Sequence, residues 1–238
     1  MANRITRHIP NAITCMNLFS GCVCCVMAIW HYYDYALLCI ILSAIFDFFD
    51  GLAARALDAH SIIGKDIDSL ADDISFGLAP GAIVFSFLSD YLIEEEGWME
   101  LLPFIAFLIA VFSALRLAKF NNDSRQTSSF IGLPVPANAL FWASLVSGLY
   151  SWLLNVPLWT LIVGIFVSCW LLVSEIPMFS LKFKNLSWTD NKIRFVFLAA
   201  SIALLFLGVP GIALIILWYI VLSVSVWIYN NYNSKAAC

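Results

Sequence analysis

The sequence contains few charged residues. Lys, Arg, Asp and Glu together make up 12% of the 238 positions, whereas 62% are hydrophobic. A soluble domain cannot bury so much apolar surface, so the composition excludes that class. The apolar runs also lack the alternation of a β-barrel. The first ten residues, MANRITRHIP, lack the apolar core and the cleavage site of a secretory signal peptide. We therefore predict an all-α, polytopic transmembrane helix bundle.

Cysteine and histidine provide no recognisable site. The seven cysteines lie mostly within apolar runs, where cysteine usually acts as a small hydrophobic residue. The CVCC segment at 22–25 lacks the ligand spacing and the partner histidines of a zinc centre. The three histidines are scattered along the chain, and none pairs with a serine in a recognisable motif. These observations exclude a disulfide framework and a cysteine-based metal role.

Eight membrane spans fit the apolar runs. A single helix over 195–230 would be about 54 Å long, too long for a bilayer, and the segment GVPG at 208–211 divides it. No repeat or linker appears, so we predict one domain over 1–238, with a motif core at 9–184 and two further spans within 194–230. The expected spans are 12–30, 36–57, 67–92, 99–119, 136–153, 157–178, 194–208 and 210–230.

The basic residues predict the orientation. If the N-terminus is inside, all twelve Lys and Arg residues fall in inner segments, and the outer loops, such as SDYLIEEEGW at 89–98, have none. Inner loops of membrane proteins carry such an excess of Lys and Arg. We expect a multi-pass protein of the inner or plasma membrane with both termini in the cytoplasm. The acidic segment 47–73 then lies at the cytoplasmic face.

That acidic segment, DFFDGLAARALDAHSIIGKDIDSLADD, contains seven aspartates between apolar runs. An aspartate at the centre of a membrane helix costs roughly 2.5–3.5 kcal/mol on insertion scales, so it indicates a functional site. Asp47 and Asp50 share one helix face, as do Asp68 and Asp72, and two helices joined by a short loop can turn these faces together. Four converging carboxylates suit a hard divalent cation such as Mg²⁺ or Mn²⁺.

Solvated acids, a cation transporter and a structural membrane protein are the alternative interpretations of these aspartates. Asp58, Asp66 and Asp73 fit a merely solvated inner segment. A cation transporter also uses intramembrane carboxylates, but it needs acids spread across the membrane or helices broken at its midplane. A purely structural membrane protein would leave the four paired aspartates unexplained.

The spacing of the acids resembles the signature motif of a known enzyme family. The pattern is D-x-x-D-G-x-x-A-R, then eight residues, then G-x-x-x-D-x-x-x-D, running from Asp47 to Asp72. It resembles the signature of the CDP-alcohol phosphotransferase family, which displaces CMP from a CDP-linked lipid with an alcohol. The resemblance implies that Asp47, Asp50 and Asp68 bind two Mg²⁺ or Mn²⁺ ions, and that Asp72 is the general base and also contacts metal.

The same resemblance implies a site for the lipid donor, CDP-diacylglycerol. The N-terminal segment IPNAITCMN, at 9–17, is similar to a Pro-Asn-x-x-Thr pattern that touches the nucleotide in the family. The donor-binding residues implied by both motifs are Asn11, Thr14, Gly51, Ala54, Arg55, Ser61 and Gly64.

Four further segments resemble the branch of the family that uses L-serine: 68–80, 114–121, 132–139 and 174–182. The implied products are phosphatidylserine and CMP. Lys65, Arg116 and Lys119 are candidates for binding the serine carboxylate, and Glu175 is a candidate partner for a basic residue or for the serine ammonium.

Other acceptors, such as glycerol 3-phosphate or inositol phosphate, and an ether-lipid donor remain alternatives. The resemblance implies a homodimer in the bilayer, and no nucleic-acid partner is expected.

Overall fold

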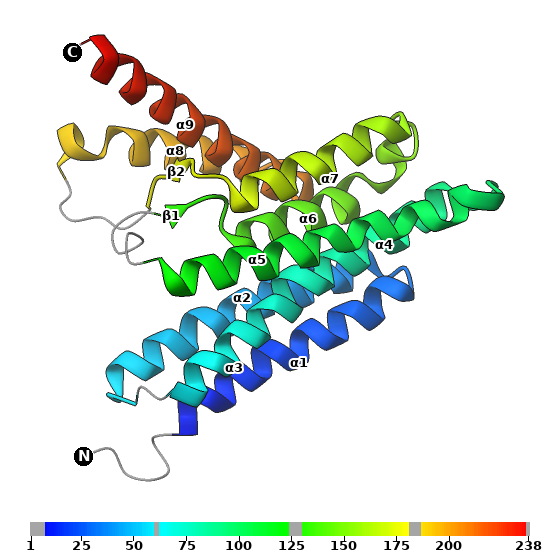
Figure 1. Cartoon of the computed structure of the whole chain (residues 1–238), viewed down its shortest axis with the longest axis horizontal. Coiled ribbons are helices and arrows are strands. Elements are labelled where there is room, and N and C mark those ends of the chain that lie inside the picture. Colours follow the sequence, from blue (N-terminus) through cyan, green and yellow to red (C-terminus); the bar gives the residue numbers. More distant parts are fainter. Residues whose placement is uncertain (1–7, 60–61, 124–129, 181–186, 237–238) are drawn as a thin grey trace.

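The computed structural model describes residues 8–59, 62–123, 130–180 and 187–236. These residues form a bundle of helices, which confirms the predicted all-α class (Figure 1). In chain order the helices are α1 (Ile9–Ile29), α2 (Tyr33–Ala56), α3 (Ile62–Asp73), η2 (Ile74–Leu78), α4 (Ala79–Tyr91), η3 (Gly97–Phe107), α5 (Leu108–Asn122), α6 (Val135–Leu153), α7 (Leu158–Val173), α8 (Trp188–Leu205) and α9 (Val209–Ala236). One short antiparallel pair joins β1 (Phe130–Ile131) to β2 (Pro177–Met178).

Several of these helices are long and apolar enough to cross a membrane. Within the described ranges five stretches meet that requirement, and α7 is a shorter apolar helix. The chain is therefore a polytopic membrane protein, and the total of eight spans stays a prediction. The five stretches are Ile9–Ile29, Tyr33–Ala56, Ile63–Tyr91, Gly97–Asn122 and Val209–Tyr232.

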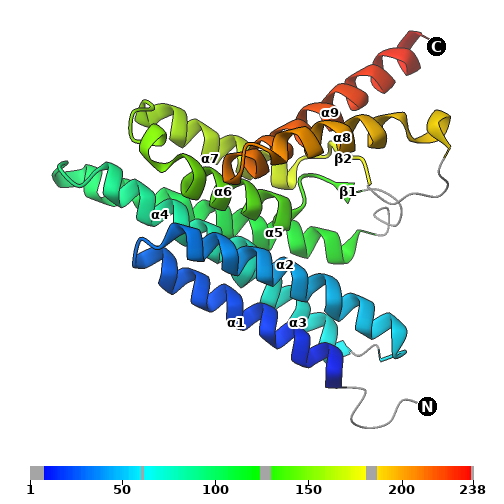
Figure 2. The ribbon, with the colours of Figure 1, turned by 180° about the vertical axis from the view of Figure 1, so that it is seen from behind.

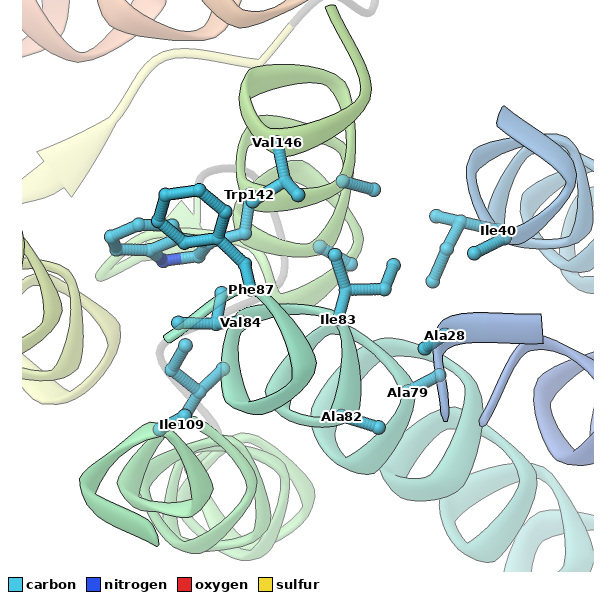
Figure 3. Packing of buried hydrophobic residues seen from close by; sticks show 14 of the residues in the cluster. Ala28, Ile40, Ala79, Ala82, Ile83, Val84, Phe87, Ile109, Trp142 and Val146 are labelled. Carbon is cyan, nitrogen blue, oxygen red and sulfur yellow. The ribbon is translucent and has the colours of Figure 1, made fainter. Parts of the chain in front are cut away.

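Helix α4 lies at the centre of the bundle. It packs against α1, α5 and α6, and its buried residues are found all around its circumference. Figure 3 shows Val84 and Phe87 of this helix between Trp142 of α6 and Ile109 of α5. On its other side Ala79 lies next to Ala28 of α1, with Ala82 on the same side. Small residues on one side and large residues on the other allow α1 to approach closely while the remaining space is filled.

The third span, α3–η2–α4, is continuous but changes its winding at one turn. Residues Ile74–Leu78 form a π-helix directly after Asp72 and Asp73. Gly21 of α1 lies against this turn, because a Cβ atom at Gly21 would come within 2.4 Å of the Ser75 Oγ. Single π-helical turns are uncommon and are often found at functional sites.

The predicted end of the sixth span was wrong. We expected 157–178, but α7 ends at Val173, and Pro177–Met178 instead pairs with β1. Gly132, at φ +76°, makes this possible, because its amide donates to the Ile176 carbonyl and a Cβ there would come within 2.5 Å of the Leu172 carbonyl oxygen. Pro177 has no amide hydrogen and disfavours a helical conformation in the residue before it.

The predicted break between the last two helices is confirmed. Gly208 has φ +72°, and α9 begins at the next residue with Pro210 in its first turn. Gly148 of α6 lies against this turn, because a Cβ atom there would come within 2.8 Å of Pro210 Cδ. The two C-terminal helices are thus attached to the core through a close contact between α6 and α9.

The two ends of the bundle differ in charge. Figures 1 and 2 place the start of α1, the end of α2 and the end of α5 at one end, and the α1–α2 turn and the end of α4 at the other. The second end carries Asp34, Asp90 and the acids Glu94–Glu96. Described basic residues at the first end include Arg55, Lys65, Lys119 and Arg194. The basic residues Arg4, Arg7, Arg125, Lys182 and Lys184, as well as Ser61, lie outside the described residues.

Candidate active site

Three of the predicted aspartates converge between α2 and α3. Asp47, Asp50 and Asp68 each offer a carboxylate oxygen, and these oxygens lie within 4.8 Å of one another. Asp50 is only 6% exposed, and Asp68 Oδ1 is buried without a hydrogen-bond partner among the described residues. Three carboxylates repel each other at such distances unless a cation lies between them.

Asp72 adjoins this cluster. It lies one turn beyond Asp68 on α3, and its carboxylate is within hydrogen-bonding range of Asp47. Two ionised carboxylates only accept hydrogen bonds, so this contact requires a shared proton or a cation. All four aspartates of the motif therefore face one another, as their spacing predicts.

Asn17 on α1 is a residue that the sequence analysis missed. Its side chain is fully buried, and Nδ2 donates a hydrogen bond to Asp72 Oδ1 at 3.2 Å. Its carbonyl oxygen accepts hydrogen bonds from Ser43 of α2 at 3.3 Å and from Ser75 of the π-helical turn at 2.9 Å. Asn17 thus joins three elements behind Asp72. A polar residue inside an apolar helix, one turn from Thr14, was the available signal.

Thr14 lies one turn before Asn17 on α1 and forms a hydrogen bond to Asp50, a different aspartate of the cluster. Its side chain is 3% exposed, and its hydroxyl donates to Asp50 Oδ2 at 2.6 Å. The same hydroxyl also lies 3.0 Å from the Pro10 carbonyl oxygen. The sequence predicted that Thr14 contacts the donor nucleotide, and here it orients a metal-ligand candidate at the cavity wall.

A cavity of about 690 Å³ opens beside the cluster. Asp50 and Asp68 lie in its wall, and so do six of the seven predicted donor-binding residues: Asn11, Thr14, Gly51, Ala54, Arg55 and Gly64. The volume falls in the range of small-molecule sites, which is roughly 300–1,000 Å³. At Gly51 a Cβ atom would meet no other atom within 4 Å, so this helix face looks onto open space. The Arg55 Nε donates to the Gly51 carbonyl at 3.0 Å.

The three predicted serine-binding cations occupy different surroundings. Lys65 is exposed and lies in the cavity wall. Lys119 forms an ion pair with Glu175 and donates to the Val173 carbonyl, so these two residues connect α5 to the segment after α7. Arg116 is only 6% exposed, and its Nε and Nη2 have no hydrogen-bond partner among the described residues.

The remaining acids of the segment also differ from one another. Asp58 and Asp66 are exposed, as expected for solvated acids, although Asp66 borders the cavity. The expectation for Asp73 was wrong, because it is partly buried and its Oδ1 is inaccessible to solvent. Asp73 faces the α5 side of the third span, next to Ser113, where solvent does not reach.

The acid cluster fits a divalent cation. Its donors are all carboxylate oxygens, the ligands that Mg²⁺ and Mn²⁺ prefer. One oxygen, Asp68 Oδ1, is buried with no hydrogen-bond partner in the described ranges, and it offers a lone pair to a cation. Asp47, Asp50 and Asp68 can therefore hold an ion, and Asp72 adjoins it.

Residues 7–170 match the CDP-alcohol phosphatidyltransferase family. Three relatives are each named CDP-diacylglycerol–serine O-phosphatidyltransferase. The Bacillus subtilis protein is 36% identical over 133 residues, which is 54% of this chain and 70% of the relative. The Mycobacterium tuberculosis protein is 35% identical over 184 residues, which is 71% of this chain and 60% of the relative. The Methanocaldococcus jannaschii protein is 30% identical over 208 residues, which is 87% of this chain and 88% of the relative.

Proposed function

Because this chain belongs to the CDP-alcohol phosphatidyltransferase family, we propose that it transfers the phosphatidyl group of CDP-diacylglycerol to L-serine, giving phosphatidylserine and CMP. The observation that carries this proposal is the convergence of Asp47, Asp50 and Asp68 beside a cavity lined by the predicted donor-binding residues. The names of the similar proteins support serine as the acceptor.

The donor binds with its CDP head in the cavity and its acyl chains in lipid. Asn11, Thr14, Gly51 and Ala54 line the space for the nucleotide, and Arg55 provides a cation for the diphosphate. Gly51 is important here because a larger side chain would occupy the open space that it faces. Ser61 belongs to the same proposal through the sequence motif alone.

Asp47, Asp50, Asp68 and Asp72 bind the metal, which we propose to be two Mg²⁺ or Mn²⁺ ions. A metal ion bound there supplies positive charge that neutralises the diphosphate and stabilises the departing CMP. Thr14 orients Asp50, and Asn17 orients Asp72, through the hydrogen bonds described above. These contacts position the ligands before the substrate arrives, which is what efficient catalysis requires.

Asp72 accepts the proton of the serine hydroxyl. The serine oxygen then forms a bond to the β-phosphorus of the donor, and the bond from that phosphorus to the CMP oxygen breaks. No covalent enzyme intermediate is needed. Arg116 binds the serine carboxylate, because two nitrogens of its buried guanidinium have no hydrogen-bond partner in the part of the chain that the structure describes, and because it lies within electrostatic range of Asp72. Lys65 is an additional cation at the cavity wall, and Lys119 acts through its ion pair with Glu175.

The active site faces the cytoplasm in this proposal. It lies at the bundle end that carries the described basic residues Arg55, Lys65 and Lys119. The excess of Lys and Arg on the inner side of membrane proteins supports a cytoplasmic site in the inner or plasma membrane. The whole chain acts as one domain. The family resemblance supports a homodimer, which the mass of the detergent-solubilised protein tests.

An acceptor panel tests the reaction. Purified protein with CDP-diacylglycerol and Mg²⁺ or Mn²⁺ should release CMP chiefly with L-serine. Faster release with glycerol 3-phosphate or inositol phosphate would exclude serine as the preferred acceptor. Repeating the assay with a CDP-linked ether lipid distinguishes the two kinds of donor.

Metal removal tests the acid cluster. Chelation should stop turnover, and added Mg²⁺ or Mn²⁺ should restore it. Asp47→Ala, Asp50→Ala and Asp68→Ala should each abolish turnover while the protein still inserts into the membrane, because removing a buried acid eases insertion. Undiminished activity after exhaustive chelation would refute the metal-binding role.

A further inference from the structure

A second set of buried polar atoms lies between the third span and α5. Asp73 Oδ1, Ser113 Oγ and two nitrogens of Arg116, Nε and Nη2, are inaccessible to solvent and have no hydrogen-bond partner in the described part of the chain. Ser113 is fully buried, and Arg116 is 6% exposed. Buried polar groups are nearly always paired, and an unpaired one costs about 1–3 kcal/mol. Four such atoms in neighbouring residues indicate a site built for a polar ligand.

The backbone brings two of these groups together. A Cβ atom at Gly77 would come within 2.9 Å of Asp73 Oδ1 and 3.0 Å of Ser113 Cβ. The missing side chain therefore leaves both groups close to the same point of the third span. The π-helical turn, Ile74–Leu78, contains Gly77 and follows Asp73 directly.

The third group, Arg116, lies on the same face of α5. It follows Ser113 by three residues, a spacing that places side chains side by side on a helix. Its guanidinium lies 5.0 Å from the centre of the Phe120 ring and within electrostatic range of Asp72. Asp72, the proposed base, thus has Arg116 near it in space and Asp73 next to it in the chain.

We propose that Asp73 and Ser113 bind the ammonium group of the acceptor and make the enzyme selective for a zwitterionic amino alcohol. The inference rests on the proposed function and extends it. The hydroxymethyl, carboxylate and ammonium groups of L-serine all branch from one carbon. They meet Asp72, Arg116 and the Asp73–Ser113 pair respectively, and three different contacts at one carbon also distinguish L-serine from its mirror image.

Glu175 does not compete for the ammonium. It forms an ion pair with Lys119, and its side chain is 57% exposed. An exposed, paired carboxylate attracts a cation weakly because water and the existing partner screen it. Asp73 has a buried oxygen with no hydrogen-bond partner among the described residues, so it binds an ammonium far more effectively.

The test compares two acceptors in the full-length, detergent-solubilised enzyme. L-serine carries the ammonium, and 3-hydroxypropanoate has the same hydroxyl and carboxylate without it. In Asp73→Asn we expect the KM for L-serine to rise about 10- to 150-fold, as for a lost hydrogen bond to a charged group. The inhibition constant of 3-hydroxypropanoate against the serine reaction should stay unchanged, because that molecule has no ammonium group to contact Asp73.

Matched variants keep the result interpretable. Asp58→Asn removes an exposed carboxylate at the same end of the bundle and should leave the KM for L-serine unchanged. Ser113→Ala leaves the acid cluster intact and should raise that KM several-fold, so it decides the question if Asp73→Asn fails to fold. The metal concentration for half-maximal activity should stay unchanged in Asp73→Asn, which excludes an indirect effect through Asp72.

Two outcomes would overturn the inference. One is an unchanged KM for L-serine in both Asp73→Asn and Ser113→Ala. The other is an equal weakening of L-serine and 3-hydroxypropanoate, which would indicate general damage to the site. If instead the wild-type enzyme releases no CMP with L-serine, the proposed function itself is wrong. The two failures are therefore distinguishable.

Discussion

Replacing Asn17 with alanine should slow the reaction without weakening donor binding. The amide Nδ2 donates to Asp72 Oδ1 at 3.2 Å from a fully buried position, so no water replaces it readily. A hydrogen bond to a charged group contributes about 1.5–3 kcal/mol. If that contribution serves to orient Asp72 in the transition state, kcat should fall by about 10- to 150-fold.

The assay is CMP release in detergent micelles at saturating donor, L-serine and metal, together with donor binding on the same preparation. Ser43→Ala is the matched control. Ser43 is also fully buried and donates to the carbonyl of Asn17 at 3.3 Å, so its hydrogen bond supports the contact between α1 and α2 and does not go to an acid. We expect Ser43→Ala to lower thermal stability while kcat changes little.

The reasoning fails if kcat of Asn17→Ala stays within about threefold of wild type, less than about 0.7 kcal/mol. It also fails if Ser43→Ala loses as much activity, because the effect would then come from helix packing and not from the orientation of Asp72.

Three further predictions address the base, the cavity and the topology. Asp72→Asn keeps the size of the side chain but cannot take up the proton, so turnover should fall at least about 100-fold while donor binding stays within about tenfold; turnover within a few-fold of wild type would show that another group is the base. Gly51→Leu should fold normally, because its side chain enters open space, yet lose donor binding in a titration with CDP-diacylglycerol; normal binding would place the head group elsewhere. With the native cysteines replaced, an impermeant thiol label should reach a cysteine at Glu95 from outside and one at Asp123 only from inside; the reverse pattern would invert the orientation.

The sequence was sufficient to predict the acid cluster because helical spacing is a local property. Asp47 and Asp50 share a face whatever surrounds them, and so do Asp68 and Asp72. The short connection between α2 and α3 then makes the two faces neighbours. The break at Gly208 was predictable for a similar reason, because glycine and proline act on the backbone locally.

Features that depend on contacts between distant segments were not predictable in this way. Asn17 is 55 residues from Asp72, and one polar residue in an apolar helix does not reveal its partner. Asp73 resembled a solvated acid because its burial depends on Ser113, which lies on another helix. Pro177 gives a local reason for α7 to end before residue 178, but the pairing of Pro177–Met178 with Phe130–Ile131 depends on a segment far away in the chain, and no local signal specified it.

The π-helical turn in the third span also determines the register between its two halves. An α-helix rotates by about 100° per residue, so the extra residue in Ile74–Leu78 offsets α4 from α3 by about that angle. Deleting one residue from the turn would leave the span nearly as long and as apolar. The deletion would, however, rotate Asp68 and Asp72 away from α2, or rotate Ile83 and Phe87 out of the core. A single-residue deletion here should therefore be far more damaging than an alanine substitution at the same place, because the turn aligns the catalytic half of the helix with its structural half.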